Sequence, residues 1–297
     1  MKTISIAELQ AQKGAATLIH VLPEEHYAST HLPGAINACV YETIFITKVS
    51  ELVPDKSSPL VVYGAGGDSL DATTAAEKLT KAGYTDVTVF PGGIAECQQQ
   101  GFPLEGTGTA ISPPAPEGHF EVDTAASLVR WTGRSLFNHH HGTLRLSGGS
   151  IEVKNGTLQS ARFTIDMNSI ACEDLVDTAF NAMLIRHLRD DDFFAVDRFP
   201  TAGFVCEHVT PLPACTPGTP NYTLHGTITL RGVSQPLSFP AVIAAADSDH
   251  LTGQAQFELD RTQFGSHYGS GKLFAFLGKH VVNDHIHLHL KIHAKRS

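Results

Sequence analysis

The chain has 297 residues, of which 42% are hydrophobic, and its formal net charge is −9. The length suggests two domains, and the hydrophobic fraction is enough to give each of them a core. The acidic charge argues against a nucleic-acid scaffold, because a phosphate-binding face needs clustered lysines and arginines, and it also disfavours adsorption on anionic membranes.

The N-terminus lacks the uninterrupted apolar run of a secretion signal, and no segment reaches the length that spans a bilayer. The cysteines are odd in number and show no CxxC spacing; they are Cys39, Cys97, Cys172, Cys206 and Cys215. This pattern indicates free thiols in a reducing compartment rather than a disulfide framework. We therefore expect a cytoplasmic protein without a membrane span.

In the first hundred residues, short apolar runs alternate with helical segments. Residues 17–22 (TLIHVL), 59–63 (PLVVY) and 87–90 (VTVF) are predicted as buried strands. A helix is predicted over 71–83, with Asp71 as its N-cap and Gly83 as its stop. This alternation predicts an α/β domain with a parallel sheet and flanking helices.

Residues 106–118 (GTGTAISPPAPEG) are rich in Gly, Pro, Ser and Thr and show neither a helical nor a strand period. They are predicted to form a linker, stiffened locally by its prolines. We therefore expect an N-terminal domain over residues 1–105 and a C-terminal domain over residues 119–297.

After the linker, apolar and polar residues alternate in eight segments, from SLVRWTG (127–133) to HIHLHLKIHA (285–294), with turn signals at Gly148-Gly149 and Asn155-Gly156. One helix is predicted over 174–189, with Phe180, Met183 and Leu188 among the residues of one apolar stripe. An antiparallel chain of this length favours a closed β-barrel with one inserted helix, because closure removes both sheet edges.

The N-terminal half resembles the rhodanese (sulfurtransferase) family over residues 4–105, through residues 18–38, 61–97 and the closing GFPLEG. Rhodanese chemistry needs a thiolate at the start of the loop that follows the central strand. Gly64 occupies that position here, and Asp68 stands where the family often carries a basic residue. The resemblance therefore implies a domain without sulfurtransferase activity that serves as an interaction or regulatory module.

Two alternatives for this half stay open. Cys39 or Cys97 could act as a substitute nucleophile, although an ordinary buried thiol is expected because neither lies in the loop that would cradle an anion. The glycine-rich loop 64–67 could still bind an anion through its amides, or could be only a tight turn.

The C-terminal half resembles the YceI-like family over residues 119–297. The resemblance rests on five segments in order: residues 119–144, 163–170, 187–204, 226–240 and 257–271. It implies a lipocalin-like antiparallel barrel that holds a polyisoprenoid or another long apolar chain. No other cofactor is required.

The candidate ligand-binding residues are apolar residues predicted to face the barrel interior or its mouth. The interior set is Val129, Trp131, Phe163, Ile165, Phe204, Phe257 and Leu288, and the mouth set is Phe193, Phe194 and Phe274. The alternative is that they only fill a core, as any barrel needs. The alternation offers no charged partner for a buried polar head group.

Two clusters of ionisable residues are candidates for a catalytic or a metal site. Residues 190–192 (DDD), with Asp260 and Arg261, are expected to organise loops, and no catalysis is predicted. His285, His287 and His289 project from one strand face, so they are candidate zinc ligands, but solvent-facing polar residues are the simpler interpretation. The triplet 139–141 could join them only if the fold brings it close.

We therefore predict a non-enzymatic carrier of an isoprenoid, an isoprenoid quinone or a fatty-acyl chain, with a possible protein partner at its rhodanese-like domain. Two alternatives remain: a sulfurtransferase with a non-standard cysteine, and a histidine-based metal-binding protein. Neither nucleic acid nor a membrane is an expected partner.

Overall fold

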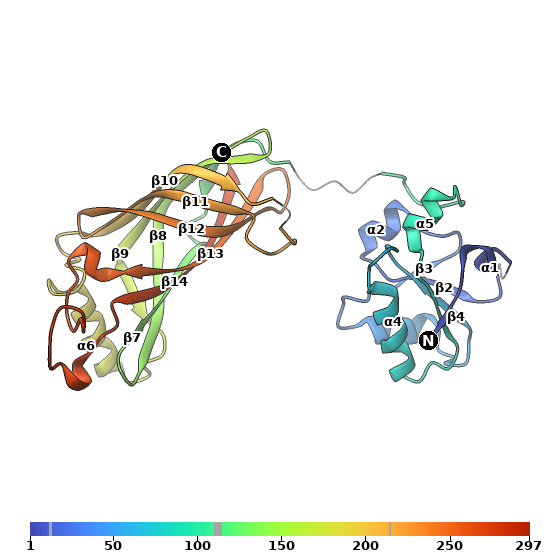
Figure 1. Ribbon diagram of the computed structural model, residues 1–297, viewed down its shortest axis with the longest axis horizontal. Helices are drawn as coiled ribbons and strands as arrows, with labels where there is room; N and C mark the ends of the chain where they lie inside the picture. The colour runs from blue at the N-terminus through green and yellow to red at the C-terminus, as the bar shows by residue number, and fades with distance from the viewer. Residues whose placement is uncertain (12–13, 110–114, 214) are drawn as a thin grey trace. The chain divides into compact units, whose positions relative to one another are not determined.

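The computed structural model describes residues 1–11, 14–109, 115–213 and 215–297, and the chain divides into two units, Met1–Ser112 and Pro113–Ser297 (Figure 1). Each unit is described by itself. Among these residues, none of the helices combines the length and the apolar character needed to cross a membrane.

The first unit is a parallel five-stranded sheet in the order β1-β5-β4-β2-β3, as the sequence predicts. Its strands are β1 (Lys2–Thr3), β2 (Thr17–His20), β3 (Ile36–Asn37), β4 (Leu60–Tyr63) and β5 (Val87–Phe90), and its helices are α1 (Ile6–Ala11), α2 (Glu24–Ser29), α3 (Phe45–Leu52), α4 (Asp71–Lys81) and α5 (Gly93–Gln99). Strand β4 is buried along its whole length and takes part in the cores on both faces of the sheet. This burial explains its continuous apolar run.

The ends of α4 are partly as predicted. Gly83 follows the C-cap residue Ala82 with a φ of +97°, a left-handed conformation that glycine adopts without strain. Asp71, however, is the first residue of the helix rather than its N-cap, which is Leu70. The Asp71 side chain turns back to the loop before the helix, so the N-cap prediction is wrong.

The second unit is a closed antiparallel barrel, which confirms the predicted fold class. Its elements are β6 (Gly118–Val122), β7 (Leu128–Arg134), β8 (His139–Lys154), β9 (Thr157–Cys172), α6 (Thr178–Arg189), β10 (Thr201–Pro211), β11 (Tyr222–Leu230), β12 (Val233–Ala245), β13 (His250–Asp260), η1 (Arg261–Phe264), η2 (Gly278–His280) and β14 (His285–Arg296). Strands β6 and β7 both pair with β8 on one side and with β14 on the other, so together they occupy one of eight positions around the barrel. The pairing of β13 with β14 closes it.

Of the two predicted turns in this part of the chain, one is confirmed and the other is wrong. Asn155 and Gly156 form the β8–β9 turn, both with positive φ, as the sequence predicts. Gly148 and Gly149 do not form a turn, because they lie inside the 16-residue strand β8, where the pairing register with β9 shifts between Leu146 and Gly148. Such a bulge bends a strand without reversing it. None of the eight alternating segments predicted from the sequence corresponds to β12.

Helix α6 begins at Thr178 rather than at residue 174. The carboxylate of Asp177 caps it by accepting hydrogen bonds from the backbone N–H groups of Ala179 (2.8 Å) and Phe180 (3.2 Å). Only the Leu188 end of the predicted apolar stripe is buried, whereas Phe180 and Met183 are exposed. The first turns of α6 therefore expose apolar side chains to solvent.

The predicted linker is only partly described, because residues 110–114 lie outside the described residues. At its start, the backbone N–H groups of Thr107 and Gly108 donate hydrogen bonds to the carbonyl oxygens of Ala28 and Ser29 in α2, at 2.9 and 3.0 Å. At its end, Gly118 is the first residue of β6. The boundaries of the linker stay a prediction.

Candidate functional site

The barrel encloses a cavity of about 200 Å³ at the end where α6 lies. Its walls come from every described strand of the barrel except β6 and β12, and α6 adds Leu184, His187 and Leu188. Most of the surface is apolar, with Trp131, Met167 and Ile228 among the larger contributors. We call this space the hollow region. The strand residues that line it face inward because every second side chain of a barrel strand points to the interior.

Six of the ten predicted ligand-binding residues line the hollow region: Val129, Trp131, Ile165, Phe193, Phe194 and Leu288. Trp131 is buried, and its indole N–H donates a hydrogen bond to the carbonyl oxygen of Ala171 at 3.2 Å. The two phenylalanines lie in the segment after α6 and pack edge to face, with ring centroids 5.5 Å apart.

The other four predicted residues lie elsewhere. Phe163 lines a separate, smaller space of about 30 Å³. Phe204 and Phe257 both pack against Phe239, with ring centroids 5.1 and 4.4 Å apart. Phe274 is half exposed on the loop before β14 and does not line the hollow region.

The aromatic group Phe204, Phe239 and Phe257 explains why the interior has two spaces. Along β13, Phe257 lies between Ala255, which lines the small space, and Leu259, which lines the hollow region. The barrel interior is therefore packed on one side of these rings and open on the other, which the alternating pattern cannot show because both sides have the same period.

The hollow region carries polar groups that the sequence analysis did not place there. Arg261, His140 and His187 all contribute to its wall, which corrects the expectation that no charged partner faces the interior. The ring of His187 packs edge to face on Tyr268 and Phe193, at 4.4 and 5.2 Å.

Arg261 is almost fully buried, and its guanidinium group holds the loop between β13 and β14 in place. It donates hydrogen bonds to the carbonyl oxygens of Ser266 (2.7 Å), Tyr268 (2.7 Å), Val282 (3.1 Å) and Asn283 (3.0 Å). Burial lowers its pKa, while nearby Asp284 and Asp260 oppose that effect. Because four of its five N–H donors are used by the chain itself, Arg261 acts chiefly as a structural residue of the cavity wall.

In the first unit, the loop after β4 is closed by a carboxylate. Oδ2 of the buried Asp71 side chain accepts hydrogen bonds from the backbone N–H of Ala65 (3.0 Å) and from the hydroxyl of Ser69 (2.7 Å). A β-carbon on Gly64 would lie 2.3 Å from Oδ1 of Asp71. Asp68, predicted to repel an anionic donor, is exposed. The carboxylate that contacts this loop is therefore that of Asp71 rather than that of Asp68.

The two thiols considered as substitute nucleophiles are both buried. Cys97 lies in α5 within the core that contains Val61 and Tyr63. Burial raises the pKa of its thiol to about 11, which leaves almost no thiolate at neutral pH. Cys39 also belongs to the buried core.

The histidines of β14 lie on the outer face of the barrel, as the alternation predicts. His285 and His289 are exposed, and Nε2 of His287 lies 3.3 Å from a carboxylate oxygen of Glu258. The triplet 139–141 lies on β8, and at this end of the barrel β7 separates it from β14. Within the described residues, His285, His287 and His289 belong to no group of three metal-binding side chains with ligand atoms within 4.8 Å of one another.

These features define a closed antiparallel barrel with an internal apolar cavity, joined to an α/β unit. The YceI-like domain model matches residues 120–294, more than half of the chain, and the rhodanese-like domain model matches residues 5–100. The chain belongs to the YceI-like family and carries an N-terminal rhodanese-like domain. No curated relative matches it in sequence.

Three solved structures illustrate the similarity of fold. BcnA from Burkholderia cenocepacia is 22% identical, with 59% of this chain and 99% of that chain covered and a TM-score of 0.47. A polyisoprenoid binding domain from Saccharophagus degradans, implicated in plant cell wall breakdown, is 14% identical over 60% and 98%, with a TM-score of 0.43. The Alr3790 protein from Anabaena sp. is 27% identical over 35% and 81%, with a TM-score of 0.32.

Proposed function

We propose that the barrel carries one elongated apolar molecule, such as a polyisoprenoid, an isoprenoid quinone or a fatty-acyl chain, with its chain in the hollow region. The observation that carries this proposal is an apolar cavity beside a packed region in the same barrel. A barrel that needed only a core would fill its whole interior with side chains, because empty apolar space forfeits dispersion contacts. Six residues predicted to contact a ligand line this space.

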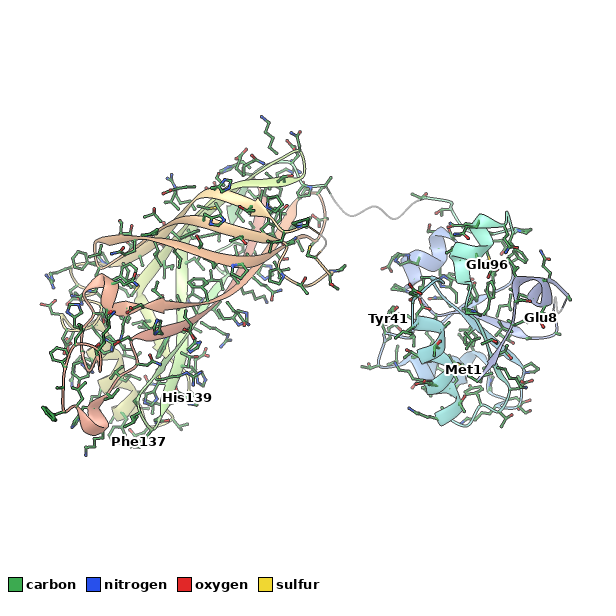
Figure 2. All side chains as sticks on the ribbon, in the orientation of Figure 1. Met1, Glu8, Tyr41, Glu96, Phe137 and His139 are labelled. Carbon is green, nitrogen blue, oxygen red and sulfur yellow. The ribbon has the colours of Figure 1, made fainter. Side chains whose placement is uncertain are left out.

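Exposed apolar side chains at the same end of the barrel support entry of such a ligand. Phe137, on the β7–β8 hairpin, is 82% exposed and projects into solvent (Figure 2). Leu136 beside it shares a surface pocket with Val281 of the loop before β14, and that loop exposes Phe274 and Phe276. Exposed apolar groups gathered near a cavity are typical of binding surfaces.

The rhodanese-like domain, we infer, does not transfer sulfur. Gly64 supplies no thiol, and the Asp71 carboxylate takes the space and the Ala65 N–H group that a persulfide would use. We propose that this domain serves as an interaction or regulatory module. The cytoplasmic location also remains a prediction from the cysteine pattern.

Trp131 is the single tryptophan of the chain and lines the hollow region, so its fluorescence tests the carrier function directly. Titration of the purified full-length chain with farnesol, geranylgeraniol or a short-chain ubiquinone should change the emission of Trp131 saturably. Mass spectrometry of an organic extract should identify the molecule that co-purifies. Absence of both an extractable apolar molecule and any fluorescence response would show that the barrel is a scaffold.

Ala202→Leu gives a sharper test, because Ala202 lines the hollow region. The larger side chain occupies space equivalent to about three methylenes, each worth roughly 0.8 kcal/mol, so affinity should fall about 50-fold. Phe163→Leu is the matched control, since Phe163 lines only the small space and its replacement leaves the hollow region unchanged. Equal affinities for the two variants would place the ligand elsewhere.

A further inference from the structure

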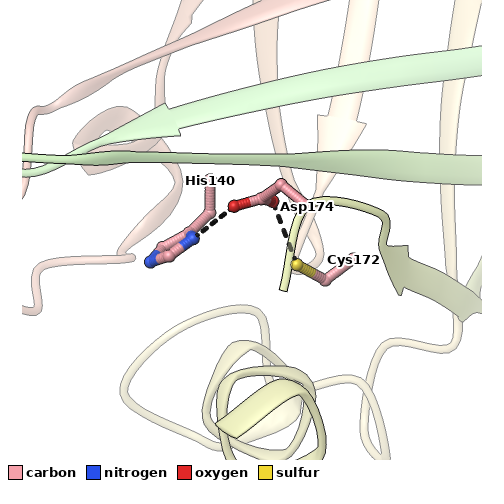
Figure 3. Close-up of side chains that lie close together, drawn as sticks. All are labelled: His140, Cys172 and Asp174. Carbon is pink, nitrogen blue, oxygen red and sulfur yellow. Dashed lines mark hydrogen bonds and ion pairs between the residues drawn. The ribbon is translucent and has the colours of Figure 1, made fainter. Parts of the chain in front are cut away.

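Three side chains of different chemistry meet beside the hollow region, where β8 and β9 pair (Figure 3). His140 comes from β8, Cys172 is the last residue of β9, and Asp174 follows it in the segment before α6. Nδ1 of His140 lies 2.8 Å from one carboxylate oxygen of Asp174, and Sγ of Cys172 lies 3.2 Å from the other. One ligand atom from each residue lies within 4.8 Å of the other two.

The strand register brings these residues together. Gly142 of β8 is paired with Cys172 of β9 in an antiparallel ladder, so His140, two residues earlier, faces Asp174, two residues later. The two backbones approach so closely here that a β-carbon on Gly142 would lie 1.8 Å from the carbonyl oxygen of Ala171. A larger residue at position 142 would therefore separate the strands and the three side chains.

Further hydrogen bonds fix the cluster. The backbone N–H of His141 donates to Oδ1 of Asp174 at 2.8 Å, and the backbone N–H of Glu173 donates to the carbonyl oxygen of His141 at 2.9 Å. The side-chain amide of Asn181 in α6 donates to the carbonyl oxygen of Cys172 at 3.1 Å. The carboxylate thus has a supporting contact of its own, as metal-ligating carboxylates usually do.

Imidazole, thiolate and carboxylate are the three ligand types that zinc takes from proteins. Ligand atoms at about 2.0–2.3 Å from a tetrahedral ion lie roughly 3.4–3.6 Å apart. The observed separations of 2.8 and 3.2 Å, which run to the two different carboxylate oxygens of Asp174, would need to widen by about 0.4–0.6 Å, and the His140 and Cys172 ligand atoms already lie within 4.8 Å of each other. Side-chain rotation can supply such changes.

We propose that His140, Cys172 and Asp174 bind one divalent transition-metal ion of the zinc class, with the fourth coordination position open to water. The thiol of Cys172, which donates its hydrogen bond to Asp174, releases its proton to solvent when the ion binds. The two anionic ligands then balance the charge of the ion. The proposal does not rest on the outer histidines of β14 or on the proposed carrier function, and one of its residues, His140, also lines the hollow region.

Cobalt(II) is the probe for the first experiment, on the full-length chain freed of metal by a chelator. We expect one ion per chain, a thiolate-to-cobalt charge-transfer band in the near ultraviolet, and quenching of Trp131. The quenching is expected because the indole N–H of Trp131 donates a hydrogen bond to the carbonyl oxygen of Ala171, the residue before Cys172. Zinc should displace the cobalt and abolish the band. Cobalt binding without the charge-transfer band would overturn the proposal, because it would exclude the thiolate.

Variants identify the ligands. Cys172→Ala should remove the band, and His140→Gln and Asp174→Asn should each weaken cobalt affinity more than about 100-fold, beyond the usual effect of a residue outside the coordination shell. His139→Gln and Cys215→Ala are matched controls, since both residues are exposed and outside the cluster, and they should bind as the unchanged chain does. Loss of binding in a control but not in Cys172→Ala would assign the ion to the surface.

A measurement on the unchanged chain guards against variants that fail to fold. Zinc should slow alkylation of Cys172 by iodoacetamide, as located by peptide mass spectrometry, while the exposed Cys215 reacts at the same rate with and without zinc. Equal rates for Cys172 with and without saturating zinc would refute the site.

Discussion

A β-carbon at position 64 would lie 2.3 Å from Oδ1 of Asp71, so the residue that lacks a side chain and the residue that fills its space are a matched pair. The carboxylate also accepts the hydrogen bond of Ala65 N–H. Both features oppose sulfur transfer. Gly64 supplies no thiol as a nucleophile, and the Asp71 carboxylate already occupies the backbone N–H group of Ala65 that an anionic persulfide would need.

We predict that the full-length chain transfers no sulfur from thiosulfate to cyanide. The thiols nearest to this chemistry are buried, and the pKa of Cys97 is raised to about 11. The measurement is a thiocyanate assay, with an active rhodanese as positive control. Turnover that disappears in Cys39→Ser but survives in Cys215→Ser would show that Cys39 is a working nucleophile.

Restoring the thiol should not be sufficient. Gly64→Cys forces a side chain against Asp71 and should destabilise the first unit by about 1–3 kcal/mol, whereas Gly64→Cys/Asp71→Ala should recover much of that loss. After incubation with thiosulfate, intact-mass measurement should find a persulfide, one added sulfur atom with release of sulfite, in the double variant but not in the single one. Equal persulfide yields would contradict the assigned role of Asp71.

The affinity of the barrel for apolar chains should rise about fourfold per methylene, since each buried methylene is worth roughly 0.8 kcal/mol, and should stop rising once the hollow region is full. Trp131 fluorescence with a series of fatty alcohols measures this directly. Affinity that follows the head group and ignores chain length would argue against a chain-binding cavity.

Phe257→Ala should increase the chain length at which the affinity for fatty alcohols stops rising. Along β13, Phe257 lies between Ala255 of the small space and Leu259 of the hollow region and stacks on Phe239, so we expect its removal to connect the two spaces, at a cost of about 3 kcal/mol in the free energy of unfolding. Urea denaturation followed by Trp131 emission measures the cost, and the alcohol series measures the limit. An unchanged limit would show that the rings of Phe204 and Phe239 alone separate the two spaces.

The first unit should lose stability as the pH falls from 6.5 towards 4. His20 is fully buried between Tyr27 and Tyr63, and burial, followed by the charges of His31 and His26, lowers its pKa to about 4 against the opposing effect of Asp71. Below pH 6.5 the unfolded chain binds a proton that the folded chain does not, so up to about 3 kcal/mol of stability, fully present above 6.5, is lost.

Hydrogen–deuterium exchange of β2 and β4 as a function of pH measures this loss, because Trp131 reports only on the barrel. His20→Leu is the control, and its protection should vary less between pH 6.5 and 4. The same pH dependence in both proteins would assign the effect to carboxylates.

The sequence by itself determined the two folds and the missing thiol. Parallel sheet and barrel follow from local periods, since the buried run of β4 and the alternation in β14 each depend only on neighbouring residues. The absence of a nucleophile at Gly64 is likewise a local fact. Even so, the glycine pair Gly148-Gly149 wrongly predicted a turn, because bulges and turns both favour glycine.

Only the tertiary structure decided what those folds enclose. Phe163 and Ile165 have the same parity on β9, yet one lines the small space and the other the hollow region, because the outcome depends on the rings contributed by β10, β12 and β13. The grouping of His140 with Cys172 and Asp174 depends on a register set by the close approach at Gly142. His140 and Asp174, for example, lie 34 positions apart in the sequence, and local periodicity carries no information about which strand becomes the neighbour of another or in which register.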